Sequence, residues 1–424
     1  MNDNDYIITG MLFGDEGKGT IVDHLAFLKR PVSVVRTGGP QAAHNVINAE
    51  GTHHTFAQFG SASLQQVPTT LSQFMLVNPF NLVTEGDLLY NKTSWNPFAD
   101  LLISETSLMI TPIHMWLNRK REEARGAAAH GSCAEGIGET RLFHIRHSES
   151  APVVADLLEP NLVRLKTKLT TLLHYAEEEA GMAWDESTID DLMEQYIQLS
   201  NDGFLNIVSD EQISDRINSG FTIFEGSQGV LLDETYGFHP HTTWGSSTSE
   251  KARQLLLDAG KEQGTVVGVT RTYATRHGFG SFPSELPNTE DVVEQYPEAH
   301  NTFGRYQGAW RRGLLDLPLL EYAGRANQGV DEVALTHCDR FNPENNTAVT
   351  GYRGWKDIPT DFFFRDRDKQ EEITNHLMSL TLADAETTTH ESFSALEADI
   401  SETLKAPVMF RSYGPTSADK QYRV

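Results

Sequence analysis

The stretch "GMLFGDEGKGT", residues 10–20, places four glycines, a lysine and two acids in one short segment. Gly14, Gly17 and Gly19 allow unusual backbone dihedrals, so the amides of this segment can approach phosphate oxygens closely. Lys18 adds a positive charge, and a helix that starts here would present its N-terminus to the same anion. The segment therefore predicts a phosphate-binding loop for a nucleotide.

This loop departs from the Walker pattern in two places, since Leu12 stands where the first glycine belongs and Gly19 follows the lysine in place of Ser or Thr. On glycines alone, a strand-to-helix turn without a ligand stays open as an alternative. Asp15 is more informative, because a carboxylate among phosphate-binding amides is unfavourable unless it meets a metal ion or removes a proton. Asp15 is therefore predicted to bind Mg²⁺ and to act as a base, with a helix N-cap as the alternative.

The elements around this loop indicate an α/β fold. "DYIITGMLF" and "VSVVRTGG" read as buried strands, and "TIVDHLAFLKR" between them has helical spacing of apolar residues. Further apolar runs that end in polar or glycine-rich loops occur in "GFTIFEGSQGVLL", "GTVVGVTRTYATRHGFG" and "VDEVALTHCDRFN". Strands that alternate with helices predict a large, mostly parallel central sheet with flanking helices and its site along one edge.

The domain organisation is predicted to be one catalytic domain over residues 1–424. Residues of about 150–205 read as helical with few strand signals, which predicts an inserted helical subdomain. No apolar run approaches the length needed to cross a bilayer, and the acidic N-terminus does not favour a signal peptide.

The charge and cysteine content restrict the partners and the compartment. The chain has 59 Asp and Glu against 34 Lys and Arg, a formal charge of −25, which argues against binding to nucleic acid or to an anionic membrane. Cys133 and Cys338 are the two cysteines, too few for a disulfide framework, so a cytoplasmic location is predicted. Neither has a neighbouring catalytic histidine pattern that favours a nucleophile.

Several motifs resemble the adenylosuccinate synthetase family in order and spacing over nearly the whole chain. "GDEGKGTIVDHLA" is similar to the family's N-terminal signature, and "VVRTGGPQAAHNVI" to its second motif. "IFEGSQGVLLDETYGFHPHTT", "TYATRHGFGSFPSEL", "ALTHCD" and "SYGP" resemble later segments, and "FGRYQGAWRRGLLD" resembles the family's basic loop in part. The resemblance implies the family's fold and a P-loop-like GTP site.

The reaction that this resemblance implies is a two-step ligation. The triphosphate first phosphorylates the 6-oxo group of a purine nucleotide, IMP in the family, and the amine of L-aspartate then displaces phosphate. The resemblance assigns Asp15 as the base at N1, His44 as the residue that stabilises the 6-oxyanion, and Lys18 as the cation for phosphoryl transfer. It also implies Mg²⁺ at Asp15 and Ala43.

The binding positions follow from the same resemblance. Asp339 keeps the carboxylate that accepts hydrogen bonds from guanine, which favours GTP over ATP as the donor. The implied nucleotide-binding residues are Gly14, Glu16, Gly17, Gly19, Arg311, Asp339, Ser412, Gly414 and Pro415, with Arg312 as an alternative to Arg311. The implied substrate-binding residues are Gln41, Cys133, Gln228, Thr243 and Gln307.

The acceptor and amine loops depart from the family pattern. "SCAEGIGE" replaces the family's "TTGRGIGP" loop, which places Cys133 at a threonine and Glu135 at an arginine that would bind a 5′-phosphate. In "YQGAWRR", Ala309 replaces an arginine that contacts aspartate and ribose, and "HGFGS" replaces "VGAGP". Compensation is expected from Arg271, Arg276, Arg305 and Arg311.

Two alternatives to a true adenylosuccinate synthetase stay open from these residues. A paralogue with the same GTP-dependent activation would use a different purine acceptor or amine donor, and the changed loops favour it. A nucleotide-binding pseudoenzyme is disfavoured, because a binding module needs neither Asp15 nor His44. Small-molecule substrates and a homodimer are implied by the resemblance alone.

Overall fold

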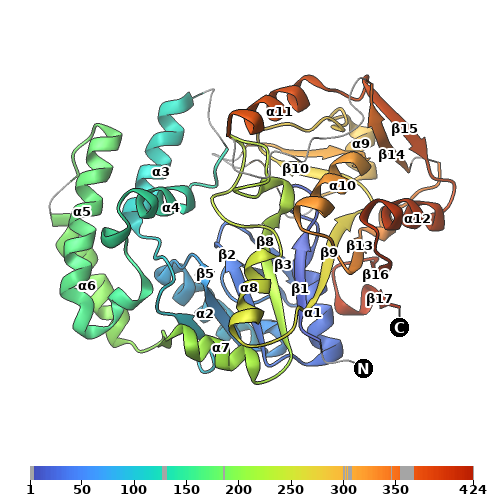
Figure 1. The fold of residues 1–424 in the computed structure, drawn as a ribbon. Coiled ribbons are helices and arrows are strands. Elements are labelled where there is room, and N and C mark those ends of the chain that lie inside the picture. Colours follow the sequence, from blue (N-terminus) through green and yellow to red (C-terminus); the bar gives the residue numbers. More distant parts are fainter. Residues whose placement is uncertain are drawn as a thin grey trace.

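The computed structural model describes residues 4–126, 131–184, 187–298, 301, 303, 308–344, 346–353 and 367–423. Its centre is a ten-stranded sheet in the order β17-β16-β13-β9-β1-β8-β2-β5-β6-β7 (Figure 1). The strands are β1 (Tyr6–Gly10), β2 (Ser33–Gly38), β5 (Thr69–Met75), β6 (Leu102–Ser104), β7 (Ile207–Val208), β8 (Thr222–Gly229), β9 (Thr265–Arg271), β13 (Glu332–Thr336), β16 (Val408–Ser412) and β17 (Lys420–Tyr422). Adjacent strands pair in parallel, except that β16 and β17 are antiparallel.

Helices cover both faces of this sheet because its central strands are apolar on both sides. Ile8 packs with α1 (Lys18–Lys29) on one face, whereas Ile7 packs with α7 (Asp210–Asn218) and α8 (Glu250–Asp258) on the other. Parallel strands place their carboxyl ends at one edge, so the loops after β1, β2, β8, β9 and β13 lie close together. The predicted α/β class with a mostly parallel central sheet is confirmed.

A helical lobe lies to one side of the sheet (Figure 1). It contains α3 (Pro112–Arg125), α4 (Ile137–Arg146), α5 (Leu162–Ala180) and α6 (Ser187–Asn201), which share one apolar core. The predicted helical segment at about 150–205 contains α5 and α6. The structure adds α3 and α4 to the same core, and α2 (Pro79–Thr93) lies at the junction with the sheet.

The remaining elements form smaller layers. Small sheets pair β3 (His44–Ile47) with β4 (His53–Phe56), β10 (Ala274–His277) with β11 (Trp310–Gly313), and β12 (Leu315–Asp316) with β14 (Thr347–Tyr352) and β15 (Ala385–Thr389). The other helices are α9 (Glu290–Gln295), α10 (Leu317–Ala326), α11 (Arg367–Ser379) and α12 (Phe393–Leu404). Among the described residues, no helix is long and apolar enough to span a membrane.

Short 3-10 helices complete the connections of the chain. They are η1 (Ser63–Gln65), η3 (Ser148–Ser150), η4 (Val154–Leu157), η5 (Glu159–Asn161), η6 (Val230–Leu232), η7 (Cys338–Arg340) and η8 (Ser417–Asp419). Of these, η7 follows β13 directly and η8 lies between β16 and β17. Both belong to loops that border the cavity described next.

Candidate active site

The loop between β1 and α1 holds its own anion. The carboxylate of Glu16 accepts hydrogen bonds from the backbone amides of Leu12 (3.0 Å) and Gly14 (2.8 Å) and from Nζ of Lys18 (2.8 Å). Although burial raises the pKa of Glu16, Lys18 and the Gly14 amide hold that pKa below its ordinary value. Gly14 and Glu16 therefore lie outside the lining of the adjacent cavity, in contrast to their predicted role as nucleotide contacts.

Asp15, in the same loop, lines that cavity. Its φ of 60° lies in the left-handed region, which Asp and Asn adopt more readily than most residues. Burial raises the pKa of the Asp15 carboxyl, and the charge of Arg271 opposes that rise. A raised pKa makes the ionised carboxylate a stronger base, which suits proton abstraction.

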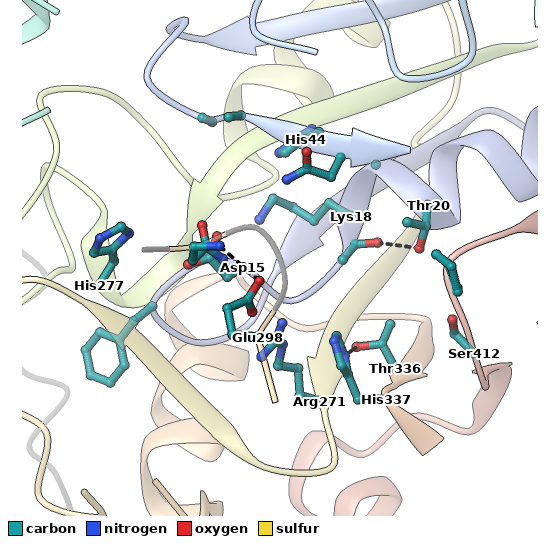
Figure 2. Close-up of a pocket in the computed structure, with 18 of the residues that line it drawn as sticks. Asp15, Lys18, Thr20, His44, Arg271, His277, Glu298, Thr336, His337 and Ser412 are labelled. Carbon is teal, nitrogen blue, oxygen red and sulfur yellow. Dashed lines mark hydrogen bonds between the residues drawn. The ribbon is translucent and has the colours of Figure 1, made fainter. Parts of the chain in front are cut away.

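Gly19 departs from the Walker pattern for a steric reason. A Cβ at Gly19 would lie 2.7 Å from Cβ of His44 and 2.8 Å from Oγ of Ser61. A serine or threonine there would therefore push β3 away from the start of α1. The lack of a side chain at Gly19 lets the His44 ring lie close to Lys18 (Figure 2).

His44 is held by a buried carboxylate. Its Nδ1 pairs with Oε1 of Glu225 at 2.5 Å, and its Nε2 lies 3.1 Å from the backbone oxygen of Ser227. A carbonyl oxygen can only accept, so Nε2 carries the hydrogen in this arrangement. Burial lowers the pKa of His44, and the hydrogen bond to Glu225 opposes that effect.

Glu225 is a functional candidate that the sequence reasoning missed. It lies in β8 at the centre of the sheet, and besides His44 it pairs with Nη1 of Arg36 at 3.3 Å and accepts from Ser61. Its side chain and that of Arg36 are fully buried. The signal in the sequence was an acid inside an apolar strand, because a buried carboxylate needs charged or hydrogen-bonding partners.

A first cavity of about 400 Å³ gathers most of the predicted residues (Figure 2). Among its lining residues are Asp15, Gly17, Lys18, Gly19, Gln41, Ala43, His44, Gln228, Asp339, Ser412, Gly414 and Pro415. They come from the ends of several sheet strands and from the C-terminal loop. The sheet edge therefore assembles segments that are far apart in the sequence.

The outer end of the first cavity has the chemistry of a base pocket. His337 follows β13 with a left-handed φ of 57°. Burial holds the pKa of its flat ring well below the ordinary value, so the ring is neutral. The carboxylate of Asp339 pairs with Nε of Arg340 at 2.9 Å and is partly exposed. Such an exposed ion pair contributes little energy, so an entering ligand can replace Arg340 as the partner of Asp339.

A second cavity of about 250 Å³ adjoins the first and faces the helical lobe. Both cavities are lined by Gln41, Gln228, Leu232 and His277. Thr243 and Cys133 line the second cavity, and Nε2 of Gln41 donates to Oγ1 of Thr243 at 2.9 Å. The Oε1 atom of Gln41 is buried and has no hydrogen-bond partner within the part of the chain that the structure describes, so it is available to a ligand.

In the loop of residues 132–139, which differs from the family pattern, one of the two changed residues lines a cavity and the other does not. Cys133 lines the second cavity, and burial raises the pKa of its thiol to about 12, which disfavours a thiolate nucleophile. Glu135, which stands at the family's phosphate-binding arginine, lines neither cavity, so its position does not bring its carboxylate against a phosphate bound there. The acids of the second cavity are Glu122 and Glu139, which pair with Arg125 and Arg121.

Arg311 does not reach the predicted nucleotide site. Its guanidinium pairs with Glu285 and donates to the backbone oxygens of Gly278 (3.0 Å) and Gly280 (2.9 Å), and it lines a third cavity instead. Gln307 and Arg305 lie outside the described residues.

Of the other arginines expected to compensate, Arg271 reaches the first cavity and Arg276 is committed elsewhere. Arg276 is buried and donates to the backbone oxygens of Phe279, Ser281 and His241. Arg271 donates from Nη1 to the Tyr273 hydroxyl at 3.1 Å, and its buried Nε has no hydrogen-bond partner among the described residues. Arg271 is therefore the described arginine placed to meet an anion beside Asp15.

Comparison with known proteins identifies a single family over almost the whole chain. The sequence profile of the adenylosuccinate synthetase family matches residues 7–419. The adenylosuccinate synthetase of Cytophaga hutchinsonii is 32% identical, with 82% of this chain and 80% of that protein covered. The one of Thermoplasma acidophilum is 29% identical, with 86% and 82% covered.

Solved structures with the same fold were also found. A fully ligated adenylosuccinate synthetase from Plasmodium falciparum has a TM-score of 0.80 at 20% identity and covers 99% of this chain and 100% of its own. The succinoaminodeoxyadenylate synthetase of cyanophage S-2L, bound to dGMP and to dATP as an energy donor, has a TM-score of 0.63 at 18% identity, with 99% and 95% covered. At these identities the two structures establish the shared fold.

Proposed function

Because the chain belongs to the adenylosuccinate synthetase family, we propose that it joins L-aspartate to IMP with the hydrolysis of GTP. The observation that carries this proposal is the meeting of two cavities beside Asp15 and Gln228. The first cavity offers Lys18 and a base pocket to a nucleoside triphosphate, and the second offers Gln41 and Thr243 to an acceptor nucleotide. The family's carbon–nitrogen ligase chemistry needs both substrates side by side.

The first step is phosphoryl transfer to the 6-oxygen of the purine. The Asp15 carboxylate removes the N1 proton, which places negative charge on the 6-oxygen and makes it a nucleophile. His44 donates from Nε2 to that oxygen once the ligand takes the place of the Ser227 carbonyl, and the carboxylate of Glu225 at Nδ1 holds the ring in that orientation. Lys18 neutralises charge on the transferred phosphoryl group.

Mg²⁺ fits the oxygen donors of the first cavity. Asp15 supplies a carboxylate and Ala43 lines the same wall, whereas the described residues contain no cluster of three or more His, Cys, Asp or Glu side chains. One protein carboxylate together with substrate phosphates is the usual mode of Mg²⁺ binding. We propose Asp15 and Ala43 as the positions that hold the ion, which when bound supplies positive charge next to the phosphates.

The proposed reaction is tested by incubating the protein with Mg²⁺, GTP, IMP and L-aspartate and analysing the nucleotide product by mass spectrometry. Adenylosuccinate, GDP and phosphate in equal amounts are expected. The result that contradicts the proposal is phosphate release without a condensed nucleotide, since the triphosphate would then be hydrolysed by water alone.

A second candidate is the same chemistry on a different purine nucleotide. It is favoured by the second cavity, where the two arginines of α3 that line it, Arg121 and Arg125, are already paired with carboxylates. Such pairing weakens their contact with an acceptor phosphate, so the acceptor need not be bound as the family binds IMP. The cyanophage structure contains dGMP, and the same assay with dGMP in place of IMP separates the two candidates.

The donor base gives a separate prediction. Asp339→Asn is expected to weaken GTP binding by about 10-fold or more, because the new amide nitrogen faces the N–H donors of guanine. ATP should be affected much less, since adenine has no such donors. Competition of GDP and ADP for the wild-type and variant proteins measures this difference.

The control for that experiment is Arg340→Ala, which keeps the carboxylate of Asp339 and removes its ion-pair partner. The Arg340→Ala protein should still bind GTP in preference to ATP. If Asp339→Asn weakened the binding of GTP and of ATP equally, that result would contradict guanine recognition by Asp339.

We further propose that the protein acts as a homodimer in the cytoplasm, on small-molecule substrates and without nucleic acid. This proposal is supported by the family resemblance, the formal charge of −25 and the two cysteines. Sedimentation equilibrium of the purified chain tests the dimer. A single monomer species at micromolar concentration would contradict it.

A further inference from the structure

The two cavities share a wall at which the proposed reaction takes place. Four residues line both cavities, namely Gln41, Gln228, Leu232 and His277. His277 is the one ionisable side chain among the four. A reacting atom of the acceptor lies next to both the phosphoryl donor and the incoming amine, so it lies near this shared wall.

His277 has a ring nitrogen available at that wall. It ends β10, where its backbone pairs with Trp310 of β11. Its Nε2 is buried and has no hydrogen-bond partner in the part of the chain that the structure describes. Figure 2 draws the His277 ring and Lys18 on opposite sides of Asp15. A buried, unpaired imidazole nitrogen is costly unless a ligand completes it.

The charged groups that face this position come from several elements. Asp15 and Lys18 lie on the loop and helix after β1, and Arg271 lies at the end of β9. Glu298 lines the first cavity, and Arg276, the residue directly before His277 in β10, lines the second. His277 thus lies between a carboxylate and several cations, near where an amino acid zwitterion would bind.

The second step of the ligation requires a proton acceptor. The amino group attacks in its neutral form, and after attack its nitrogen must lose one proton to leave an uncharged C–N bond, in addition to the N1 proton lost in the first step. Asp15 takes the N1 proton in the proposed function, and both ring nitrogens of His44 are engaged by Glu225 and Ser227. Neither group is therefore placed to receive the proton of the amine.

We propose that Nε2 of His277 accepts the proton of the attacking amine. In this step the amine nitrogen forms a bond to C6 of the purine, and the bond from C6 to the phosphorylated oxygen breaks. Phosphate leaves with the electron pair of that bond, and the proton of the amine passes to Nε2 of His277. The inference rests on the proposed function, and it assigns a catalytic residue to the amine-addition step.

The test separates the two steps of the reaction in His277→Val and His277→Gln. Phosphoryl transfer is followed by positional isotope exchange, the movement of a heavy-oxygen label from the bridge of GTP to a non-bridging position, with acceptor and without amine. Amine addition is followed by formation of the condensed nucleotide. Both variants are expected to keep exchange and to form product about 10²-fold more slowly, the usual effect of losing a general base.

Controls keep the outcome interpretable. His174→Val removes an exposed histidine of α5 and should leave both rates unchanged. Exchange in the His277 variants itself shows that they fold and bind both nucleotides. Added imidazole is expected to restore part of the product formation in His277→Ala, because the small base can enter the space left by the ring.

Three results would overturn the proposal. If the rates of exchange and of product formation fell equally, His277 would only shape the pocket. If His277→Val formed product at the wild-type rate, His277 would have no role in the reaction. Product formation in His277→Gln at the wild-type rate would show that a hydrogen bond suffices. Failure of the proposed function is distinct, since the wild-type protein would then show no exchange at all.

Discussion

Asp15→Asn is expected to lower phosphoryl transfer about 10³-fold, within the range found for loss of a general base. The amide has the size and shape of the carboxylate but cannot accept the N1 proton. The substitution also removes the negatively charged carboxylate ligand of the proposed Mg²⁺ site. Both effects act on the first step, so positional isotope exchange and product formation should fall together, in contrast to the His277 variants.

The fold should tolerate this change, because Asn also adopts the left-handed backbone that Asp15 has at φ 60°. Burial raises the pKa of the Asp15 carboxyl, which means that its ionised form is on balance unfavourable in the folded chain. Replacing it with a neutral amide therefore removes no net stabilising interaction. The melting temperature should therefore stay at or above that of the wild type. Asp87→Asn, on the exposed face of α2, is the matched control. Unchanged exchange in Asp15→Asn would exclude Asp15 as the base.

The fold could be predicted largely because its signals are local. The strand, glycine loop and helix from Tyr6 to Lys29 follow from apolar periodicity and from glycines that permit a tight turn. The same reasoning placed β2, β8, β9 and β13. The extent of the helical lobe was harder, because α3 and α4 join α5 and α6 only through tertiary packing.

The candidate site could be predicted where a residue's role depends on its position after a strand. Lys18, His44, Gln228 and Asp339 all reach the first cavity, because parallel strands bring their carboxyl ends to one edge. Arg311 was misplaced for a different reason. A long side chain can point to either side of its strand, and here Glu285 and two carbonyls draw it away.

Glu16 and Glu225 show what the sequence could not provide. Glu16 looked like a nucleotide contact, whereas its carboxylate folds back onto the amides of its own loop. Glu225 looked like part of an apolar strand, whereas it holds His44 and Arg36 together from strands distant in sequence. In both cases the role is fixed by partners whose proximity arises only in the folded chain.

Glu225→Gln is expected to have the second large effect, on both stability and catalysis. The amide leaves the fully buried Arg36 without a counter-charge, and breaking such a pair costs about 3–5 kcal/mol of unfolding free energy. It also removes the carboxylate that orients His44, so phosphoryl transfer should fall by about 10²-fold. Denaturant unfolding and positional isotope exchange measure the two effects on the same sample.

The pH dependence of stability provides a second test of the network formed by Glu225, Arg36 and His44. Burial alone would raise the pKa of Glu225, but Arg36, His44 and Ser61 lower it from 4.5 to about 2. Because the folded-state pKa lies below the unfolded one, this group stabilises the fold above about pH 4.5 and loses that contribution as the pH falls toward about 2. The wild-type protein should therefore lose more stability over this interval than Glu225→Gln.

Glu85→Gln is the matched control that separates stability from catalysis. Glu85 is also a buried acid, and it accepts from the backbone amides of Ala57, Gln58 and Phe59, away from His44. Its replacement should destabilise the chain and leave exchange per folded molecule unchanged, because no catalytic side chain depends on it for orientation. Exchange at the wild-type rate in folded Glu225→Gln would show that His44 is positioned without this carboxylate, and its role would then rest on the packing against Gly19.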